Sequence, residues 1–312
     1  MLVLDNINLL DRERNNYVAL GSFDGLHLGH LSLINKVKEL AKDNNGKSMV
    51  FTFKNHPRTI IMSESKLDLL MTNNEKQDVL SKEKIDILAF KNFDKDIMTM
   101  DPEKFVEWLC NSYSIRGIVV GFNFRFGYKN LGDVNLLRKL QDKYHYELWV
   151  MEPYIFEDEV VSSTRIRKEL LEGDLSKANI MLSRPYSLSG KVVHGKKLGR
   201  TIGFPTANIL VENSKIIPRI GVYYSNVKIN GKFFKGITSV GHNPTVNGKE
   251  LTVETYILDF DEYIYDEIIT IYFIDRIRDE MKFNGVNALA EQLEKDKNYA
   301  INKELAFDKN RV

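Results

Sequence analysis

Hydrophobic and polar residues follow two different rhythms along this 312-residue chain. In the first half, short apolar runs that favour β-strands alternate with longer stretches in which apolar positions recur every three or four residues, as in amphipathic helices. We expect strands at Tyr17–Phe23, Ser48–Phe53, Ile85–Phe90, Gly117–Phe122 and Tyr146–Met151, and helices at Leu31–Lys42, Pro102–Tyr113 and Asp133–Lys143. Strands separated by helices are typical of a parallel sheet with helices on both faces.

After about residue 183 the rhythm changes to closely spaced strand-like runs. These runs are Ser187–Val193, Gly221–Ile229, Lys232–Val240, Leu251–Leu258 and Ile268–Ile274. Asn230-Gly231 separates two of them, and this dipeptide favours a two-residue hairpin turn. The pattern predicts a small antiparallel barrel closed by a helix near Val286–Lys295. We therefore expect an α/β, Rossmann-like domain over residues 1–182 and an all-β barrel domain over residues 183–312.

The charge balance, the single cysteine and the lack of long apolar runs limit the kinds of molecule that the protein can bind. Lys and Arg (44) nearly balance Asp and Glu (43), so no global field attracts polyanions, and phosphate binding must be local. The single cysteine, Cys110, excludes an internal disulfide and a Cys-rich metal site, and its apolar helical surroundings indicate a core residue. Neither a secretory signal nor an 18-residue apolar run is present. We expect a cytoplasmic protein with no nucleic-acid or membrane partner, and weak self-association stays open.

The first candidate site is a glycine-rich turn between a strand and a helix, Gly21-Ser-Phe-Asp-Gly-Leu-His-Leu-Gly-His30. Its three glycines let backbone approach a phosphate closely, and the helix N-terminus beyond favours an anion. His27 and His30 are three apart, so in a first helical turn they project to one side and could donate hydrogen bonds to ATP phosphates. A metal site or a plain surface is the alternative, and no third ligand cluster in the sequence supports a metal.

A second segment, Ser162-Ser163-Thr164-Arg165-Ile166-Arg167, follows the last strand of this half. The hydroxyl residues are typical of an N-cap, and we expect a helix Arg165–Leu171 that stops at Gly173. Taken alone, the segment is better explained as a helix cap with solvated arginines. In a parallel sheet, however, segments that follow strand ends can meet at one crevice, where this cap and Arg167 would bind phosphate.

The second half contains no Walker motif, but it carries the glycine-rich segment Gly195-Lys-Lys-Leu-Gly-Arg-Thr-Ile-Gly-Phe-Pro-Thr-Ala-Asn208. Its glycines suit close approach to phosphate, and its lysines and Arg200 add positive charge. Thr206 and Asn208 face the same way on an extended segment, and two neutral oxygens on one face suit Mg²⁺. For these residues alone, a proline-marked turn that enters a strand is the default interpretation.

Glu254 lies in the apolar run Leu251–Leu258, where we expect its carboxylate to be buried. A buried carboxylate is costly unless it has a partner or a role, and burial would make it a stronger general base. The alternative is an outward-facing glutamate on an alternating strand, and the residues alone favour that alternative.

Taken together, the motifs resemble a known family. The combination of H-x-G-H with S-S-T-x-I-R is similar to the H-x-G-H nucleotidylyltransferases. A narrower resemblance, to the bacterial bifunctional riboflavin kinase/FAD synthetases, rests on G-x-F-D-G-x-H-x-G-H, Phe51–Arg58 and Gly121–Gly127, with Gly132-Asp133 behind them. The second half resembles riboflavin kinase through the ordered segments Arg184-Pro-Tyr, G-R-x-x-G-F-P-T-A-N, Gly221-Val-Tyr, Gly241–Thr245, Val253-Glu-Thr and Arg276–Phe283.

The resemblance implies an enzyme that phosphorylates riboflavin to FMN and then adenylylates FMN to FAD, with ATP as co-substrate and Mg²⁺ as cofactor. It implies catalytic roles for His27, His30 and Glu254, with Glu254 as the base for the ribityl hydroxyl. Thr206 and Asn208 would bind the metal. His56, Asn123 and Arg278 would contact flavin, although Asn123 as a plain turn residue stays open. The implied nucleotide-binding residues are Gly21, Phe23, Asp24, Gly25, Gly29, Ser163, Thr164, Arg167, Gly195, Gly199, Arg200 and Gly203.

Two positions depart from the family's pattern: Asn55 stands where proline is common, and Asp266 where glycine is customary. We expect small changes of loop shape at both.

Two other functions stay open at this point. One is an adenylyltransferase of another substrate class with a barrel that only binds flavin, and the other is a flavin sensor without catalytic activity.

Overall fold

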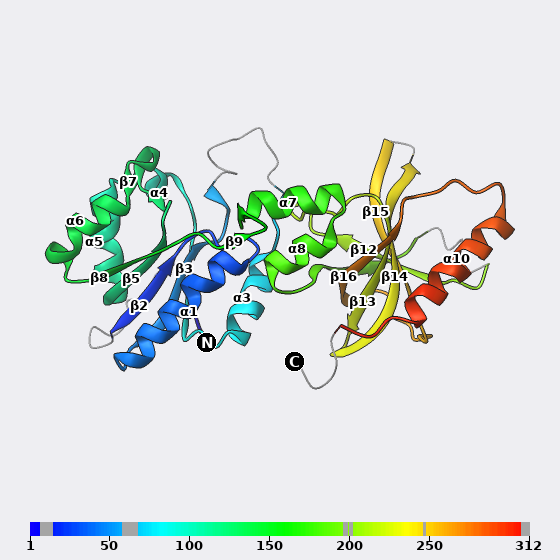
Figure 1. Ribbon diagram of the computed structural model, residues 1–312, viewed down its shortest axis with the longest axis horizontal. Coiled ribbons are helices and arrows are strands. Elements are labelled where there is room, and N and C mark those ends of the chain that lie inside the picture. The colour runs from blue at the N-terminus through cyan, green and yellow to red at the C-terminus, as the bar shows by residue number, and fades with distance from the viewer. Residues whose placement is uncertain (7–14, 58–67, 196–198, 200–201, 246–247, 307–312) are drawn as a thin grey trace. The chain divides into compact units, whose positions relative to one another are not determined.

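The computed structural model describes residues 1–6, 15–57, 68–195, 199, 202–245 and 248–306, and only the backbone within 243–250. The chain forms two compact units, Met1–Ser163 and Thr164–Val312 (Figure 1). The first is an α/β unit and the second contains a closed antiparallel barrel, so the predicted fold class is confirmed. The functional boundary between residues 182 and 183 stays a prediction, because the helix pair that precedes it groups with the barrel.

The first unit is built on a parallel sheet with the strand order β1-β4-β3-β2-β5-β8. Its strands are β1 (Leu2–Asp5), β2 (Asn16–Leu20), β3 (Lys47–Phe53), β4 (Ile87–Lys91), β5 (Ile115–Gly121) and β8 (Glu147–Met151). The chain places β3 and β4 on one side of β2, and β5 and β8 on the other. Such a reversal of strand order opens a crevice at the carboxyl ends of the strands, which is where ligands bind in open α/β sheets.

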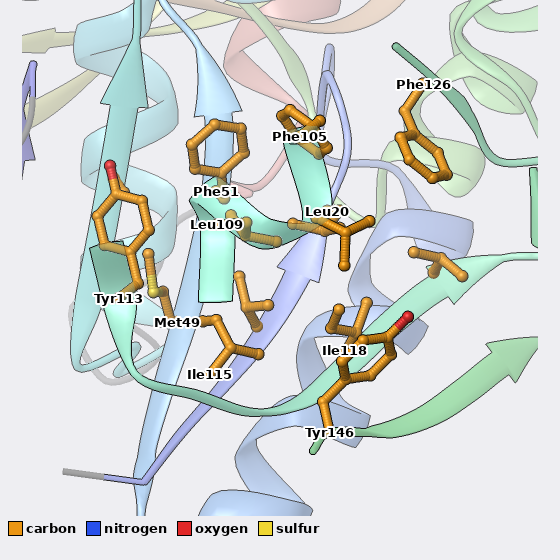
Figure 2. Close-up of a cluster of buried hydrophobic side chains, with 14 of the residues drawn as sticks. Leu20, Met49, Phe51, Phe105, Leu109, Tyr113, Ile115, Ile118, Phe126 and Tyr146 are labelled. Carbon is orange, nitrogen blue, oxygen red and sulfur yellow. The ribbon is translucent and has the colours of Figure 1, made fainter. Parts of the chain in front are cut away.

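Side chains alternate between the two faces of the sheet. On one face, Val18 and Leu20 pack with Phe51, Phe105 and Tyr146 in a cluster rich in aromatic rings (Figure 2). On the other face, Tyr17 and Ala19 pack with Ile34, Val37 and Leu80 from the helices. Because both faces are covered, the strands are apolar almost throughout, as is usual for parallel sheets.

The helices of the first unit are α1 (Leu28–Asp43), α3 (Asn73–Lys82), α4 (Lys95–Thr99), α5 (Pro102–Tyr113) and α6 (Val134–Tyr144). Helix α5 has the bounds that the sequence predicts, because Asp101 caps it and Pro102 occupies its first position. Cys110 of α5 packs against the aromatic cluster, and burial raises the pKa of its thiol to about 12. Short pieces complete the unit: β6 (Arg125–Phe126), η1 (Tyr128–Asn130), β7 (Gly132–Asp133), β9 (Ile155–Phe156) and β10 (Glu159–Val160).

The barrel has the strand order β11-β12-β15-β14-β13-β16, and β16 pairs back to β11. The strands are β11 (Tyr186–Val193), β12 (Thr206–Val211), β13 (Gly221–Ile229), β14 (Lys232–Thr245), β15 (Gly248–Ile257) and β16 (Ile268–Arg278), with helices α7 (Ser163–Glu172), α8 (Leu175–Leu182) and α10 (Val286–Ile301). Asn230 and Gly231 both have positive φ, as the predicted hairpin between β13 and β14 requires. Strands β14 and β16 run past their predicted ends, because ladders with β15 and β13 continue there.

Helix α10 is attached to the end of β16 by a buried ion pair. Arg278 donates to both carboxylate oxygens of Asp296, from Nε to Oδ1 and Oδ2 at 3.1 Å each and from Nη2 to Oδ2 at 2.7 Å. Asp296 is 2% exposed, and Gln292 donates a further bond to its Oδ1 at 2.9 Å. Bidentate geometry of this kind is the strong form of an Arg–carboxylate contact.

Replacing Asp296 by alanine should destabilise the barrel by about 3 kcal/mol, because it leaves the half-buried Arg278 guanidinium without its partner. The measurement is the denaturant midpoint of the full chain. Glu294→Ala on the same helix is the matched control, since its contact with Lys297 is exposed at 3.9 Å and should matter by less than about 1 kcal/mol. Equal shifts for the two variants would contradict the assignment.

Among the helices that the structure describes, none is long and apolar enough to cross a membrane.

Candidate nucleotide and flavin sites

The predicted glycine-rich turn lies directly after β2, the strand at which the sheet order reverses. Helix α1 begins at Leu28, three residues earlier than the sequence pattern predicts, because His27 serves as its N-cap. Gly25 has a φ of +85°, a left-handed conformation that glycine adopts without strain. The turn and the first residues of α1 therefore lie at the edge of the sheet where a ligand is expected.

The two histidines lie against each other, as their spacing predicts. Their rings are stacked with centroids 3.7 Å apart and an interplanar angle of 19°. The Nδ1 atom of His27 accepts a hydrogen bond from the backbone N–H of His30 at 3.4 Å, so in a neutral ring the proton is on Nε2. His27 is buried and His30 is partly exposed, so the pair reaches the surface at the N-terminus of α1 through the ring of His30.

Phe23 and the neighbouring glycines hold this histidine pair in place. The ring of Phe23, which is fully buried, meets His30 edge-on with centroids 5.2 Å apart. A Cβ on Gly29 would lie 3.2 Å from the His27 ring, and one on Gly21 would lie 3.2 Å from the Phe23 ring. Side chains at these two glycine positions would therefore push against the rings that set the histidine geometry.

Asp24 shapes the turn and does not point toward solvent. It is 3% exposed, and its Oδ1 atom accepts hydrogen bonds from the backbone N–H groups of Leu70 at 3.0 Å and Met71 at 3.2 Å. Its own carbonyl oxygen accepts a bond from the hydroxyl of Ser163 at 2.8 Å, across 139 residues of chain. The second motif is thus brought to the turn at Ser163, as the parallel sheet predicts.

The N-cap position before helix α7 falls on Ser162, the first hydroxyl residue of the segment, and its capping role stays a prediction. Helix α7 begins at Ser163, so Ser163 and Thr164 lie inside its first turn, and the Ser163 hydroxyl donates to Asp24. Thr164 is exposed and Arg167 is partly exposed on the same helix, which ends before Gly173 as predicted. Ser163 therefore acts as a link between the two motifs, and Thr164 and Arg167 stay predictions as phosphate ligands.

A second polar group behind the turn, missing from the sequence prediction, involves Lys76 of α3 and Thr52 of β3. Lys76 is 5% exposed, and its Nζ atom donates to the carbonyl oxygen of Ser22 at 2.8 Å and to Thr52 Oγ1 at 3.4 Å. Thr52 also donates to the same Ser22 oxygen, at 3.0 Å. The Thr72-x-x-Glu75 capping box that starts α3 is visible in the sequence and could have located this helix.

The predicted flavin-contacting residues of this unit follow the strands on either side of β2. His56 comes after β3 and Asn123 after β5, so parallel pairing brings both to the same edge as the turn. Asn55, which departs from the family's pattern, is held by two reciprocal hydrogen bonds with the backbone of Phe93 at 2.9 and 2.8 Å. These bonds fix the loop where a proline would have restricted it. Asn123 is exposed, and its contact with flavin stays a prediction.

In the barrel, three predicted site residues meet on neighbouring strands. Asn208 of β12 is paired directly with Glu254 of β15, and Thr206 is two residues from Asn208 on the same face. The Thr206 hydroxyl donates to Glu254 Oε2 at 3.4 Å. Thr206 and Asn208 lie on β12 directly after a turn at Gly203, so the predicted proline-marked turn that enters a strand is confirmed.

The predicted burial of Glu254 is wrong. Its neighbours Val253 and Thr255 are buried, whereas Glu254 is partly exposed on the outer face of the barrel. Thr255 instead points inward, where its hydroxyl meets those of Thr238 and Ser225 in a buried chain with oxygens 3.0 and 2.7 Å apart. The alternation of β15 thus sets Glu254 beside Thr206 and Asn208, where a substrate can reach it.

The glycine-rich segment before β12 lies close to this group. A Cβ on Gly195 would lie 2.3 Å from the Asn208 amide nitrogen, so only glycine permits the observed approach. Similarly, a Cβ on Gly199 would lie 2.2 Å from the carbonyl oxygen of Phe204. Gly203 has a positive φ and is exposed. Arg200, like the lysines 196 and 197, lies outside the described residues, so its role stays a prediction.

Arg278 has a partner other than the predicted flavin. Its guanidinium group is bound to Asp296, and its Nη1 atom donates to the carbonyl oxygen of Asp279 at 3.1 Å. The flavin contact of Arg278 therefore stays a prediction.

Asp266, the other departure from the family's pattern, has a φ of +68°, so it adopts the left-handed conformation that glycine favours.

A parallel sheet carries a stacked histidine pair on the turn at its reversal point, and Asp24 of that turn accepts a hydrogen bond from Ser163. These features define the first unit as a nucleotidylyltransferase-like domain, here on the same chain as a barrel. The family models described as FAD synthetase and riboflavin kinase match residues 10–165 and 182–303. The chain belongs to the family of bifunctional riboflavin kinase/FMN adenylyltransferases.

Relatives with that name cover nearly the whole chain. The one from Listeria monocytogenes is 37% identical over 284 residues, 90% of each chain, and the one from Bacillus subtilis is 33% identical over 295 residues, 93% of each. A solved structure described as a macrolide-efflux protein from Streptococcus pneumoniae is 30% identical, with a TM-score of 0.89 over 97% of this chain and all of its own. Efflux is that protein's description, and the comparison shows that the two chains share one fold.

Proposed function

We propose that the two reactions of this family are divided between two groups of residues. Riboflavin and ATP give FMN and ADP at the Thr206, Asn208 and Glu254 group, and FMN and ATP give FAD and pyrophosphate at the turn that carries His27 and His30. As a member of the family, the chain is an enzyme of FMN and FAD synthesis that uses ATP as co-substrate. The assignment of residues to steps is our proposal.

For adenylyl transfer, the FMN phosphate attacks the α-phosphorus of ATP, and pyrophosphate leaves. Negative charge grows on the phosphate oxygens as the bond to the leaving group breaks, so fixed donors placed there lower the barrier. The Nε2–H of His27 and the ring of His30 supply such donors from one rigid stack. His56 and Asn123 would place the flavin, and Thr164 and Arg167 stay predicted phosphate ligands.

For riboflavin phosphorylation, the ribityl 5′-hydroxyl attacks the γ-phosphorus of ATP. Glu254 takes the hydroxyl proton, and the Thr206 hydroxyl, 3.4 Å from Glu254 Oε2, orients the carboxylate. The glycine segment around Gly195 brings backbone against Asn208, which suits a phosphate chain lying on this face.

The residues present fit Mg²⁺. Hydroxyl, amide and carboxylate oxygens face one way on β12 and β15, and such hard oxygen donors are the ligands that Mg²⁺ prefers. Among the described residues, no cluster of three or more His, Cys, Asp or Glu could hold a metal. The ion would therefore take phosphate oxygens as further ligands. Thr206 and Asn208 would hold it, and its charge would offset the negative charge of the phosphates.

The single observation that carries the proposal is the pairing of Asn208 with Glu254, which puts a candidate base beside candidate metal ligands on an exposed face. Each step is tested separately by the product it releases. Riboflavin and ATP should yield ADP, and FMN and ATP should yield pyrophosphate. A barrel that only binds flavin would yield no ADP, and a flavin sensor would yield neither product. Cytoplasmic location and weak self-association stay parts of the proposal.

A further inference from the structure

Behind the histidine turn lies a buried ammonium group that the proposed chemistry does not use. Lys76 is 5% exposed and sits one helical turn before the fully buried Leu80, on the face of α3 that packs into the core. A lysine is costly at such a position unless its donors are bonded. Its Nζ atom donates to the carbonyl oxygen of Ser22 and to the hydroxyl of Thr52, at 2.8 and 3.4 Å.

The Ser22 carbonyl is the part of the turn that needs support. It belongs to the peptide bond that leads into Phe23, and Phe23 has a φ of +48°, a strained conformation for a bulky residue. Such a conformation persists only where the surroundings fix it. Lys76 and Thr52 both donate to this one oxygen, so they fix the peptide plane that sets the position of the Phe23 ring.

A chain of contacts links that peptide to the histidines. The Phe23 ring meets His30 edge-on at 5.2 Å, and His30 stacks on His27 at 3.7 Å. Burial lowers the pKa of Lys76 to about 8 while the charge of Asp24 raises it, so the ammonium form still predominates at neutral pH. Asp24, 3% exposed, anchors the other side of the same turn.

We propose that Lys76 is a positioning residue for adenylyl transfer: its ammonium group holds the Ser22 carbonyl and thereby fixes Phe23 and the His27–His30 pair. This inference rests on the proposed function of the histidines. The described hydrogen bonds of Lys76 are to Ser22 and Thr52 and not to the histidines, so its effect must pass through the turn.

The test is the rate of FAD formation from supplied FMN and ATP by the full-length Lys76→Met variant. Methionine keeps most of the buried stem but lacks the ammonium group. We expect kcat to fall about ten- to a hundredfold, because small misplacement of catalytic groups has effects of this size. The KM for ATP should change little, and riboflavin phosphorylation should keep its wild-type rate. The matched control is Lys82→Met, on the same helix but exposed, with full activity expected.

A double-mutant cycle separates positioning from general loss of stability. In a His30→Ala background, Lys76→Met should lower kcat by less than about threefold, because the group it positions is already absent. If the two losses multiply, Lys76 does not act through His30 and the inference is wrong. A folded Lys76→Met variant with wild-type kcat would also overturn it.

If Lys76→Met fails to fold, Thr52→Val is the second test, because it is nearly isosteric and removes the hydroxyl that donates to Ser22 and accepts from Lys76. We expect a three- to tenfold lower kcat for FAD formation, with riboflavin phosphorylation intact. An unchanged kcat would contradict the inference. Failure of the wild-type chain to form FAD would instead refute the proposed function, so the two failures are distinguishable.

Discussion

Replacing His30 by alanine should stop synthesis at FMN. The variant loses one phosphate donor and also the ring against which His27 is stacked at 3.7 Å, so its effect should exceed that of losing a single exposed donor. Loss of one fixed donor to a developing charge lowers kcat by about 100- to 1,000-fold, and we expect FAD formation to fall by at least this factor. The measurement is chromatography of FMN and FAD during turnover of riboflavin with ATP.

Riboflavin phosphorylation is the internal control for this variant, and it should proceed at the wild-type rate. His145→Asn is a matched control, since His145 is exposed at the end of α6 in a left-handed conformation that asparagine tolerates. It should leave both reactions unchanged. A folded His30→Ala protein that still makes FAD at the wild-type rate would remove the histidine pair from the mechanism.

Glu254→Gln should impair riboflavin phosphorylation and leave FAD formation intact, the reverse of His30→Ala. The amide keeps the size of the side chain and can still accept a hydrogen bond from Thr206, but it cannot take the proton of the ribityl hydroxyl. General-base catalysis contributes roughly 100- to 10,000-fold, so riboflavin phosphorylation should fall by that factor. Supplied FMN should still be converted to FAD. Release of ADP from riboflavin and ATP, and of pyrophosphate from FMN and ATP, measures the two effects.

The control for this charge change is Glu267→Gln, at an exposed position just before β16. It should leave both rates unaltered. Loss of both activities in a folded Glu254→Gln protein would show that the division of labour is wrong, and an unaffected phosphorylation rate would show that Glu254 is not the base.

Local signals explain where the sequence predicted the fold well. Helix α5 has its predicted bounds because Asp101 and Pro102 mark its start within two residues, and the β13–β14 hairpin follows from Asn230-Gly231. The extension of β14 depends on pairing with β15, and no signal within the strand itself specifies that ladder. The apolar pattern gives no signal for helix α3, because Val79 and Leu80 are its only apolar residues.

At the candidate sites, too, contacts between neighbours in sequence could be predicted, and contacts between distant segments could not. The spacing of His27 and His30 alone predicts that they lie together, since one helical turn brings them there. The residues alone favour an outward-facing Glu254, and the structure agrees, but which residues it meets there depends on the pairing of β15 with β12 and β14. The bond from Ser163 to Asp24 spans 139 residues and depends on the whole first unit being folded.

A single incubation shows whether one chain carries both activities. The full-length protein is mixed with riboflavin, ATP and Mg²⁺, and flavins are separated by chromatography over time. We expect FMN to appear first and FAD to follow, with ADP and pyrophosphate as the second products. FMN without FAD would contradict the role of the first unit, and the absence of both flavin products would contradict the account as a whole.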